Sequence, residues 1–290
     1  MFITIGISFY NAENFLADAI RSVFAQSHQE WELILIDDGS KDRSLEIARS
    51  VDDPRVRVFS DGKNKKLASR LNEIVSLANY EFIARMDADD LMSSDRLEKQ
   101  IKILIDNPEI DLVSTGLYSI SDNLELKGVR WHSSNYISFD EILHRRGCGV
   151  VHASILGRKE WFKRNPYNTN LKVAQDYELW VRTSFNNDFN IYLIQYPLYF
   201  YREEGSVNAD KVLLSYINEK KLYKLYSNHN YRILSMKLNL KATLIKFLKK
   251  INKFNFLVKK RSKKTLDPKL IGIFNKEIKY IKNIKVKGLN

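Results

Sequence analysis

The chain has 290 residues, of which 44% are hydrophobic and 28% are charged, and its formal net charge is +12 at pH 7. This length suits one large α/β domain with an appendage, and the single cysteine, Cys148, excludes a disulfide framework and fits a reducing compartment. The sequence has no run of 18 or more apolar residues and no signal-peptide pattern, so we expect a cytoplasmic protein without a transmembrane span.

The charge is distributed unevenly along the chain. Residues 211–290 include 22 basic and 3 acidic residues, a net charge of +19, whereas the preceding part has a net charge of −7. This shift predicts a main domain over residues 1–209 and a basic, mostly helical extension over residues 210–290.

Short apolar strands alternate with amphipathic helical patterns in the first 90 residues. Strands are expected at residues 2–8, 33–36, 56–58 and 82–84. Apolar residues recur at helical spacing within residues 16–24, 45–48 and 67–78. Asn14 and Ser40 are expected to cap the first two helices. The alternation predicts an α/β fold with a mainly parallel sheet flanked by helices.

Polar residues stand at the carboxyl ends of three of these strands, which is the edge where such sheets bind ligands. They are Tyr10, the segment Asp37-Asp38-Gly39-Ser40 and the segment Asp87-Ala88-Asp89-Asp90. If the last segment is extended, Asp87 and Asp89 face the same side, and their carboxylates suit a hard divalent cation. Taken alone, the segment also fits an acidic turn whose aspartates cap a helix.

A second candidate site lies in the segment Ala174-Gln175-Asp176-Tyr177-Glu178-Leu179-Trp180. Asp176 precedes a short helix whose residues Leu179, Trp180 and Thr183 are expected to face inward. The alternative for Asp176 is a helix N-cap, a role that is compatible with catalysis. Residues 192–202 predict a strand that closes the main domain and ends in Arg202.

Four motifs together resemble the family 2 glycosyltransferases of the GT-A fold, and in particular the bacterial surface-polysaccharide branch. They are Ser8-Phe9-Tyr10-Asn11, Asp37-Asp38-Gly39-Ser40, Ala84-Arg85-Met86-Asp87-Ala88-Asp89-Asp90 and Asp95-Arg96-Leu97. The motifs have the family's order and spacing, and the resemblance covers about residues 3–207. It implies a Rossmann-like GT-A domain.

The resemblance also implies roles for individual residues. Asp176 would be the catalytic base, and Asp89 would hold a divalent metal cofactor, Mn²⁺ or Mg²⁺. Residues implied in binding the nucleotide-sugar donor are Ser8, Tyr10, Glu13, Asp38, Lys66, Asp87 and Arg202. Of these, Tyr10 would stack on the base, Asp38 would accept a hydrogen bond from uracil, and Asp87 would contact the ribose or the diphosphate.

The expected activity is inverting hexosyl transfer from a UDP-sugar to a hydroxyl of a growing glycan or lipid-linked acceptor, as in capsule or O-antigen synthesis. Asp176 would remove the proton of that hydroxyl, and a single displacement would invert the anomeric carbon. The Gln-x-x-Arg-Trp signature of processive relatives is absent from the sequence. One alternative is a nucleotidyltransferase, which also uses paired aspartates and metal but leaves the Asp176 segment unexplained.

The basic extension contains an apolar stripe bordered by lysines. The stripe consists of Leu240, Leu244, Phe247, Leu248 and Ile251. Such a helix is typical of peripheral attachment to an anionic membrane surface. The alternatives are packing on the main domain or on a second copy in a homodimer. A nucleic-acid-binding tail is a further alternative, but Phe247, Phe254 and Phe256 lie among aliphatic residues, so no nucleic acid partner is expected.

Overall fold

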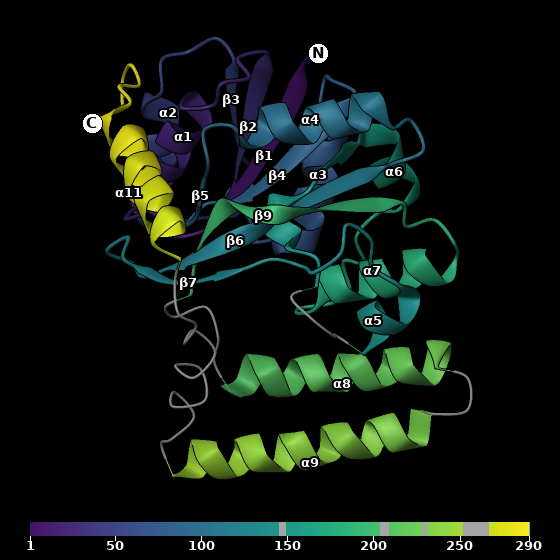
Figure 1. Cartoon of the computed structure of the whole chain (residues 1–290). Coiled ribbons are helices and arrows are strands. Elements are labelled where there is room, and N and C mark those ends of the chain that lie inside the picture. Colours follow the sequence, from purple (N-terminus) through teal and green to yellow (C-terminus); the bar gives the residue numbers. More distant parts are fainter. Residues whose placement is uncertain (145–148, 204–208, 228–230, 252–266, 290) are drawn as a thin grey trace.

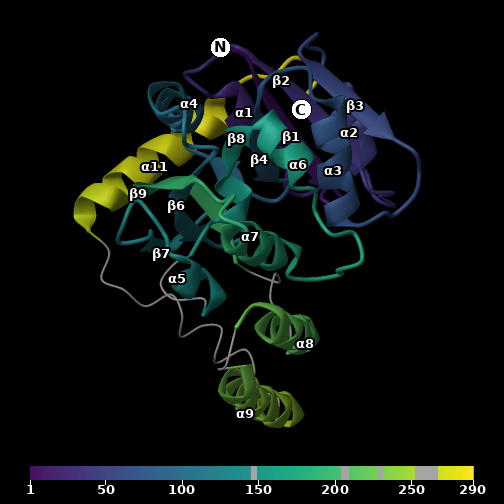
Figure 2. The same ribbon diagram turned by 90° about the vertical axis from the view of Figure 1, so that its right-hand side faces the viewer.

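The computed structural model describes residues 1–144, 149–203, 209–227, 231–251 and 267–289. Cys148, Phe254 and Phe256 lie outside these residues. A nine-stranded sheet forms the centre of the molecule, and helices cover both of its faces (Figure 1, Figure 2). The strand order is β3-β2-β1-β4-β8-β6-β9-β5, with β7 paired to β6.

The first four strands of this order confirm the predicted parallel sheet. They are β1 (Ile3–Phe9), β2 (Trp31–Asp37), β3 (Val56–Ser60) and β4 (Phe82–Asp87), and these four strands run parallel to one another. The helices between them are α1 (Leu16–Phe24), α2 (Ser44–Ser50) and α3 (Leu67–Leu77). Because β1 and β4 are neighbours, Ser8 and Asp87 are paired in register at the carboxyl edge.

The second half of the sheet is mixed. Its strands are β5 (Leu91–Met92), β6 (Leu112–Ile120), β7 (Leu126–Arg130), β8 (Leu156–Arg158) and β9 (Ile191–Arg202). β6 and β9 are parallel, while β5, β7 and β8 pair antiparallel with their neighbours. The helices here are α4 (Arg96–Asp106), α5 (Phe139–Leu143), the 3₁₀ helix η1 (His152–Ser154), α6 (Lys159–Arg164) and α7 (Gln175–Phe185). The α/β fold class is thereby confirmed.

Both capping predictions are wrong. α1 begins at Leu16 and α2 at Ser44, and neither helix has a side-chain hydrogen bond at its N-cap. The Oγ of Ser40 instead accepts a hydrogen bond from the backbone N–H of Asn11 at 3.1 Å. Ser40 therefore joins two loops at the carboxyl edge of the sheet. It does not cap α2, because that helix begins four residues later, at Ser44.

The C-terminal part separates into two pieces (Figure 1). Helices α8 (Ala209–Tyr226) and α9 (Tyr231–Lys250) form a hairpin below α7, whereas α11 (Pro268–Asn283) lies beside α1. Phe274 of α11 is buried, and its ring centroid lies 5.7 Å from that of Tyr118 and 5.8 Å from that of Phe200. The predicted boundary near residue 210 stays a prediction, and α11 shares its core with the main domain.

The chain after α11 is held closely against the main domain. The backbone N–H of Asp52 donates to the carbonyl of Lys287 at 2.9 Å. Gly288 has φ +81°, and a Cβ at this position would lie 1.8 Å from the carbonyl oxygen of Ser50, so the close approach requires glycine. Among the described helices, none combines the length and the apolar character needed to cross a bilayer.

Candidate active site

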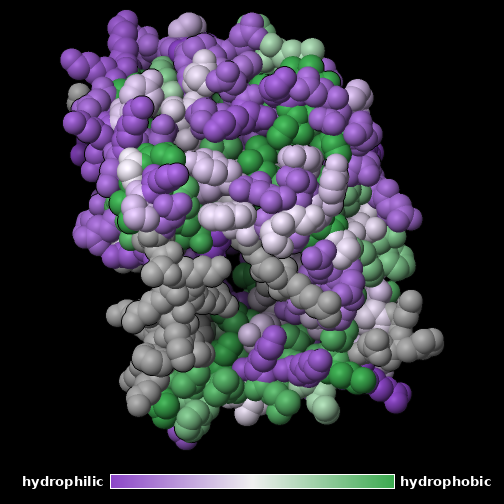
Figure 3. Space-filling view, in the orientation of Figure 1, coloured by the Kyte–Doolittle hydropathy of each residue, from purple (hydrophilic) through white to green (hydrophobic). Residues whose placement is uncertain are grey.

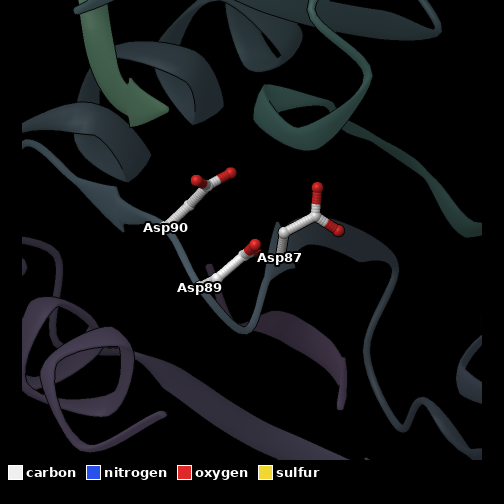
Figure 4. Close-up of side chains that lie close together, drawn as sticks. All are labelled: Asp87, Asp89 and Asp90. Carbon is white, nitrogen blue, oxygen red and sulfur yellow. The ribbon is translucent and has the colours of Figure 1, made fainter. Parts of the chain in front are cut away.

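An acidic cluster forms where β4 ends. The chain turns at Ala88 and Asp89 instead of continuing extended as predicted. As a result, one carboxylate oxygen from each of Asp87, Asp89 and Asp90 lies within 4.8 Å of the other two. Figure 4 shows the side chain of Asp87 at the end of β4 and those of Asp89 and Asp90 on the short loop that leads to β5. Asp90 is therefore a site residue that the predicted set lacks, and its place in the run of aspartates was the available signal.

The crowding of carboxylates raises the pKa values of Asp89 and Asp90. The surrounding protein and then the charge of Asp87 raise the pKa of Asp89 to about 6, although this side chain remains exposed. Burial and the charges of Asp89 and Asp87 raise the pKa of Asp90 well above its usual value. A bound cation removes this repulsion.

The residues of the cluster fit a divalent metal ion. Mn²⁺ and Mg²⁺ prefer carboxylate oxygens, and the cluster offers them from three side chains. The Oδ1 of Asp90 accepts a hydrogen bond from the backbone N–H of Arg202 at 2.8 Å. The Oδ2 of Asp90 is buried and has no hydrogen-bond partner in the described part of the chain. A buried oxygen of this kind calls for a ligand.

Arg202 supports the acidic loop from the neighbouring strand β9. Its buried guanidinium donates to the carbonyl oxygens of Asp89 at 2.5 Å and of Asp122 at 2.5 Å. It also lies over the ring of Phe15, 4.6 Å from the centroid. These contacts give Arg202 a role in fixing the loop, and its contact with the donor stays a prediction.

Three further predicted donor residues lie around the end of β1. Ser8 is the register partner of Asp87, and Tyr10 follows β1 with 51% of its surface exposed, so its ring is open to stacking. The carboxylate of Glu13 accepts a hydrogen bond from the backbone N–H of Arg43 at 3.0 Å, just before α2. Ser8 borders the acidic cluster and Tyr10 is the first residue after β1, whereas Glu13 holds the start of α2.

Asp38 organises the loop that precedes α3. Its Oδ1 accepts hydrogen bonds from the backbone N–H of Lys65 at 2.7 Å and from the Nε of Arg70 at 2.9 Å. Its Oδ2 accepts one from the backbone N–H of Lys66 at 3.1 Å. The Lys66 side chain is exposed to solvent. A carboxylate can accept about four hydrogen bonds, so the Asp38 carboxylate can accept one more beside these three, and the contact with uracil stays a prediction.

Asp176 is the second residue of α7. The N-cap of this helix is Ala174, with φ 59°, so the N-cap alternative for Asp176 is wrong. Leu179, Trp180 and Thr183 are buried as predicted.

Asp176 and the acidic cluster act on the same buried arginine, Arg85 of β4. The Nη2 of Arg85 lies 2.6 Å from the Oδ1 of Asp87. Burial acts to lower the pKa of Arg85, but the charge of Asp87 and, more weakly, that of Asp176 raise it above its usual range. Arg85 is therefore paired with Asp87 and lies within electrostatic range of Asp176, which is far away in the sequence.

The comparison with known families decides the class of this protein. The profile described as Glycosyl transferase family 2 matches residues 4–165. The chain belongs to glycosyl transferase family 2. This membership favours sugar transfer over the nucleotidyltransferase alternative.

Two relatives in this family illustrate the similarity. EpsE of Bacillus subtilis strain 168 is 33% identical over 211 residues, which cover 70% of this chain and 73% of EpsE. The Escherichia coli protein named UDP-Glc:alpha-D-GlcNAc-diphosphoundecaprenol beta-1,3-glucosyltransferase WfgD is 26% identical over 237 residues. That match covers 79% of this chain and 91% of WfgD.

Solved structures confirm the GT-A fold. TarS of Staphylococcus aureus in complex with UDP-GlcNAc superimposes with a TM-score of 0.60 at 16% identity, over 80% of this chain and 73% of TarS. The mannosyltransferase PcManGT of Pyrobaculum calidifontis, in complex with GDP-Man and Mn²⁺, has a TM-score of 0.58 at 13% identity. The match covers 96% of this chain and 84% of the PcManGT chain.

Proposed function

We propose that this family 2 enzyme is an inverting, metal-dependent hexosyltransferase that uses a UDP-linked sugar. The observation that carries the proposal is the cluster of Asp87, Asp89 and Asp90 at the carboxyl end of β4, in a chain that belongs to family 2. The structural neighbour TarS, solved with UDP-GlcNAc, supports a UDP-sugar donor.

Asp87, Asp89 and Asp90 would hold the divalent metal ion beside the diphosphate. When bound, the ion would act as a Lewis acid toward the departing diphosphate. Tyr10, exposed at the end of β1, would stack on the base, and Asp87 would orient the ribose or the diphosphate.

Asp176 would act as the base for the acceptor. Its carboxylate would take the proton from the acceptor hydroxyl while that oxygen attacks the anomeric carbon. The bond from this carbon to the diphosphate would break on the opposite face, so one displacement would invert the configuration. An α-linked donor would give a β-linked product.

We also propose that helix α9 brings this site to a membrane surface. Its outward face carries five exposed apolar side chains at helical spacing, namely Ile233, Met236, Leu240, Leu244 and Phe247, and the exposed Ile251 directly follows the helix. The same helix contains six basic residues and no acidic residue. Figure 3 shows hydrophobic side chains gathered over α8 and α9 at the foot of the molecule. An apolar stripe with basic borders is complementary to an anionic lipid surface.

The hairpin also connects this stripe to the site. Leu234 and Leu238 on the inner face of α9 belong to the same buried cluster as Leu222 of α8 and Tyr177 of α7. Because α7 carries Asp176, a membrane that binds α9 would lie on the acceptor side of the enzyme. This position favours a lipid-linked acceptor at the cytoplasmic face, as in the synthesis of a bacterial surface polysaccharide. WfgD, whose name specifies an undecaprenol-linked acceptor, supports this role.

Donor binding is the first test of the proposal. Melting temperatures are measured with UDP-, GDP-, CMP- and dTDP-sugars, each with Mn²⁺, with Mg²⁺ and with a chelator. We expect stabilisation by UDP-sugars that depends on the metal, since a ligand that binds only the folded state raises its stability. NMR of the transferred sugar then reports the anomeric configuration. Retention, or stabilisation that persists with the chelator, would contradict the proposal.

A further inference from the structure

Arg85 has two hydrogen-bond donors with no partner in the interior of the protein. The residue is 6% exposed, and its Nη2 donates to Asp87 at 2.6 Å. The Nε and the Nη1 are buried and find no acceptor in the described residues. Buried donors of a charged group are almost always hydrogen-bonded, so these two N–H groups point to a ligand.

The strand geometry places these donors on the side of the sheet that faces α7. Ile83 of β4 belongs to the same buried cluster as Trp180 of α7. Side chains two residues apart on a strand share a face, so Arg85 and Asp87 lie on this side as well. Both are on β4, where Asp87 is the last residue and Arg85 lies two residues before it.

The polar groups around Arg85 come from both ends of the reaction. Asp87 belongs to the acidic cluster, and Asp176 is the proposed base. Burial raises the pKa of the Tyr167 phenol, and the charge of Arg85 acts to lower it. The charges of Asp176 and Asp87 act to raise it further, so all three charged groups influence Tyr167. Next to Asp176, the Oε1 of Gln175 is buried and also lacks a partner in the described chain.

The transferred sugar is the part of the donor that must lie between these two ends. Its anomeric carbon is bonded to the diphosphate on one side and is attacked by the acceptor oxygen on the other. A sugar ring offers hydroxyl oxygens that accept hydrogen bonds and hydroxyl protons that donate them. The free N–H groups of Arg85 match the first of these needs, because they can donate to the hydroxyl oxygens.

We infer that Arg85 binds the sugar of the donor, with its Nε and Nη1 donating hydrogen bonds to ring hydroxyl oxygens, and thereby selects which sugar is transferred. This inference rests on the proposed function. Asp87 holds the guanidinium in place through Nη2, so one arginine joins the diphosphate end to the sugar. Because the fork of donors is planar and fixed, its selectivity comes from the positions of the hydroxyl oxygens.

The experiment compares the affinity for UDP with the affinity for the UDP-sugar that stabilises the wild-type protein most, both in Mn²⁺, by titration calorimetry. In Arg85→Met and Arg85→Lys we expect UDP to bind within about twofold of wild type, and the UDP-sugar to bind about 10- to 100-fold more weakly. Arg57→Met is the matched control, because Arg57 pairs with Glu32 on the sheet and is remote from the acidic cluster. We expect it to bind both ligands as wild type does.

Other outcomes separate the inference from the proposed function. A similar loss for UDP and for the UDP-sugar would assign Arg85 to the diphosphate and overturn the inference alone, as would wild-type affinity for both ligands in the two variants. If Arg85→Met fails to fold, Arg85→Lys decides, because it keeps the charge beside Asp87 while it loses the planar fork. Failure of the wild-type protein to bind any nucleotide or nucleotide sugar would overturn both.

Discussion

The Nε of Arg70 lies 2.9 Å from the Oδ1 of Asp38, and both side chains are buried. The same guanidinium reaches Asp61 at 2.6 Å and Glu73 at 2.7 Å. One arginine therefore ties the end of β2 to α3 and to the loop between β3 and α3. In this way the loop that precedes α3 is held in place by ion pairs within the protein itself.

This pairing predicts that Asp38→Ala destabilises the protein. The change leaves the buried Nε of Arg70 and the N–H groups of Lys65 and Lys66 without their acceptor. We expect the free energy of unfolding to fall by about 3 kcal/mol, measured by urea denaturation. Glu46→Gln, which breaks an exposed ion pair with Arg43, is the control and should leave the midpoint unchanged. Equal midpoints for the two variants would show that Asp38 is dispensable for the loop.

Asp176→Asn should nearly abolish transfer. A general base of this kind contributes about 10²- to 10⁴-fold to the rate, so turnover should fall by that factor while donor affinity stays unchanged. Turnover is followed by the release of UDP with acceptor present. Glu178→Gln is the matched control, since Glu178 lies in the same first turn of α7 and pairs with Arg182. Full turnover in Asp176→Asn would remove this residue from the mechanism.

Asp89→Asn should stabilise the protein when no metal is present. The pKa of Asp89 is raised to about 6 from an ordinary value of 3.8. Between these values the folded protein holds more protons than the unfolded chain, so the contribution of Asp89 to stability decreases as the pH rises through 6. In chelator, the variant should melt above wild type at about pH 7.5, and the difference should vanish near about pH 4.

Metal ions should reverse this order. Mn²⁺ should raise the melting temperature of wild type at about pH 7.5, because it binds the folded acidic cluster, and should affect Asp89→Asn much less. Asp106→Asn, in an exposed pair with Lys102, is the control for the loss of one charge. An equal effect of Mn²⁺ on wild type and Asp89→Asn would contradict the assignment of Asp89.

The stripe on α9 should bind anionic membranes. In flotation with vesicles that contain phosphatidylglycerol, the wild-type protein should float at low salt, whereas Leu240→Glu combined with Phe247→Glu should bind at least about tenfold more weakly. Ile105→Glu, at another exposed apolar residue, is the control. A wild-type dimer that the double variant loses, without vesicle binding, would assign the stripe to a second copy of the chain.

Replacing each of two phenylalanines of the C-terminal part with alanine should change the stability of the protein by different amounts. Phe274 is 3% exposed against Tyr118 and Phe200, so Phe274→Ala should lower the free energy of unfolding by about 3 kcal/mol. Phe247 is 58% exposed, and Phe247→Ala should change it by less than about 0.5 kcal/mol. Urea denaturation measures both. Similar losses would mean that α9 and α11 contribute equally to the fold.

Much of the fold was accessible from local sequence patterns. The alternation of strands such as Leu33-Ile34-Leu35-Ile36 with helical periods predicted the parallel sheet, because the spacing of apolar residues reports which faces are buried. The polar residues at the carboxyl ends of the strands indicated the candidate site, because parallel strands end at one edge of the sheet. The family motifs added the roles of residues that lie in those segments.

Contacts between distant segments were decided by the tertiary structure alone. Arg202 of β9 donates to the carbonyl of Asp89, and the packing of α7 leaves Asp176 within electrostatic range of Arg85. The local turn at Ala88, which an extended pattern does not predict, also brings Asp90 into the acidic cluster. The sequence also gave no sign that α11 returns to the main domain while the face of α9 stays exposed. An apolar stripe specifies that a helix has a face to bury but does not specify its partner, because the partner depends on which surfaces the rest of the fold leaves uncovered.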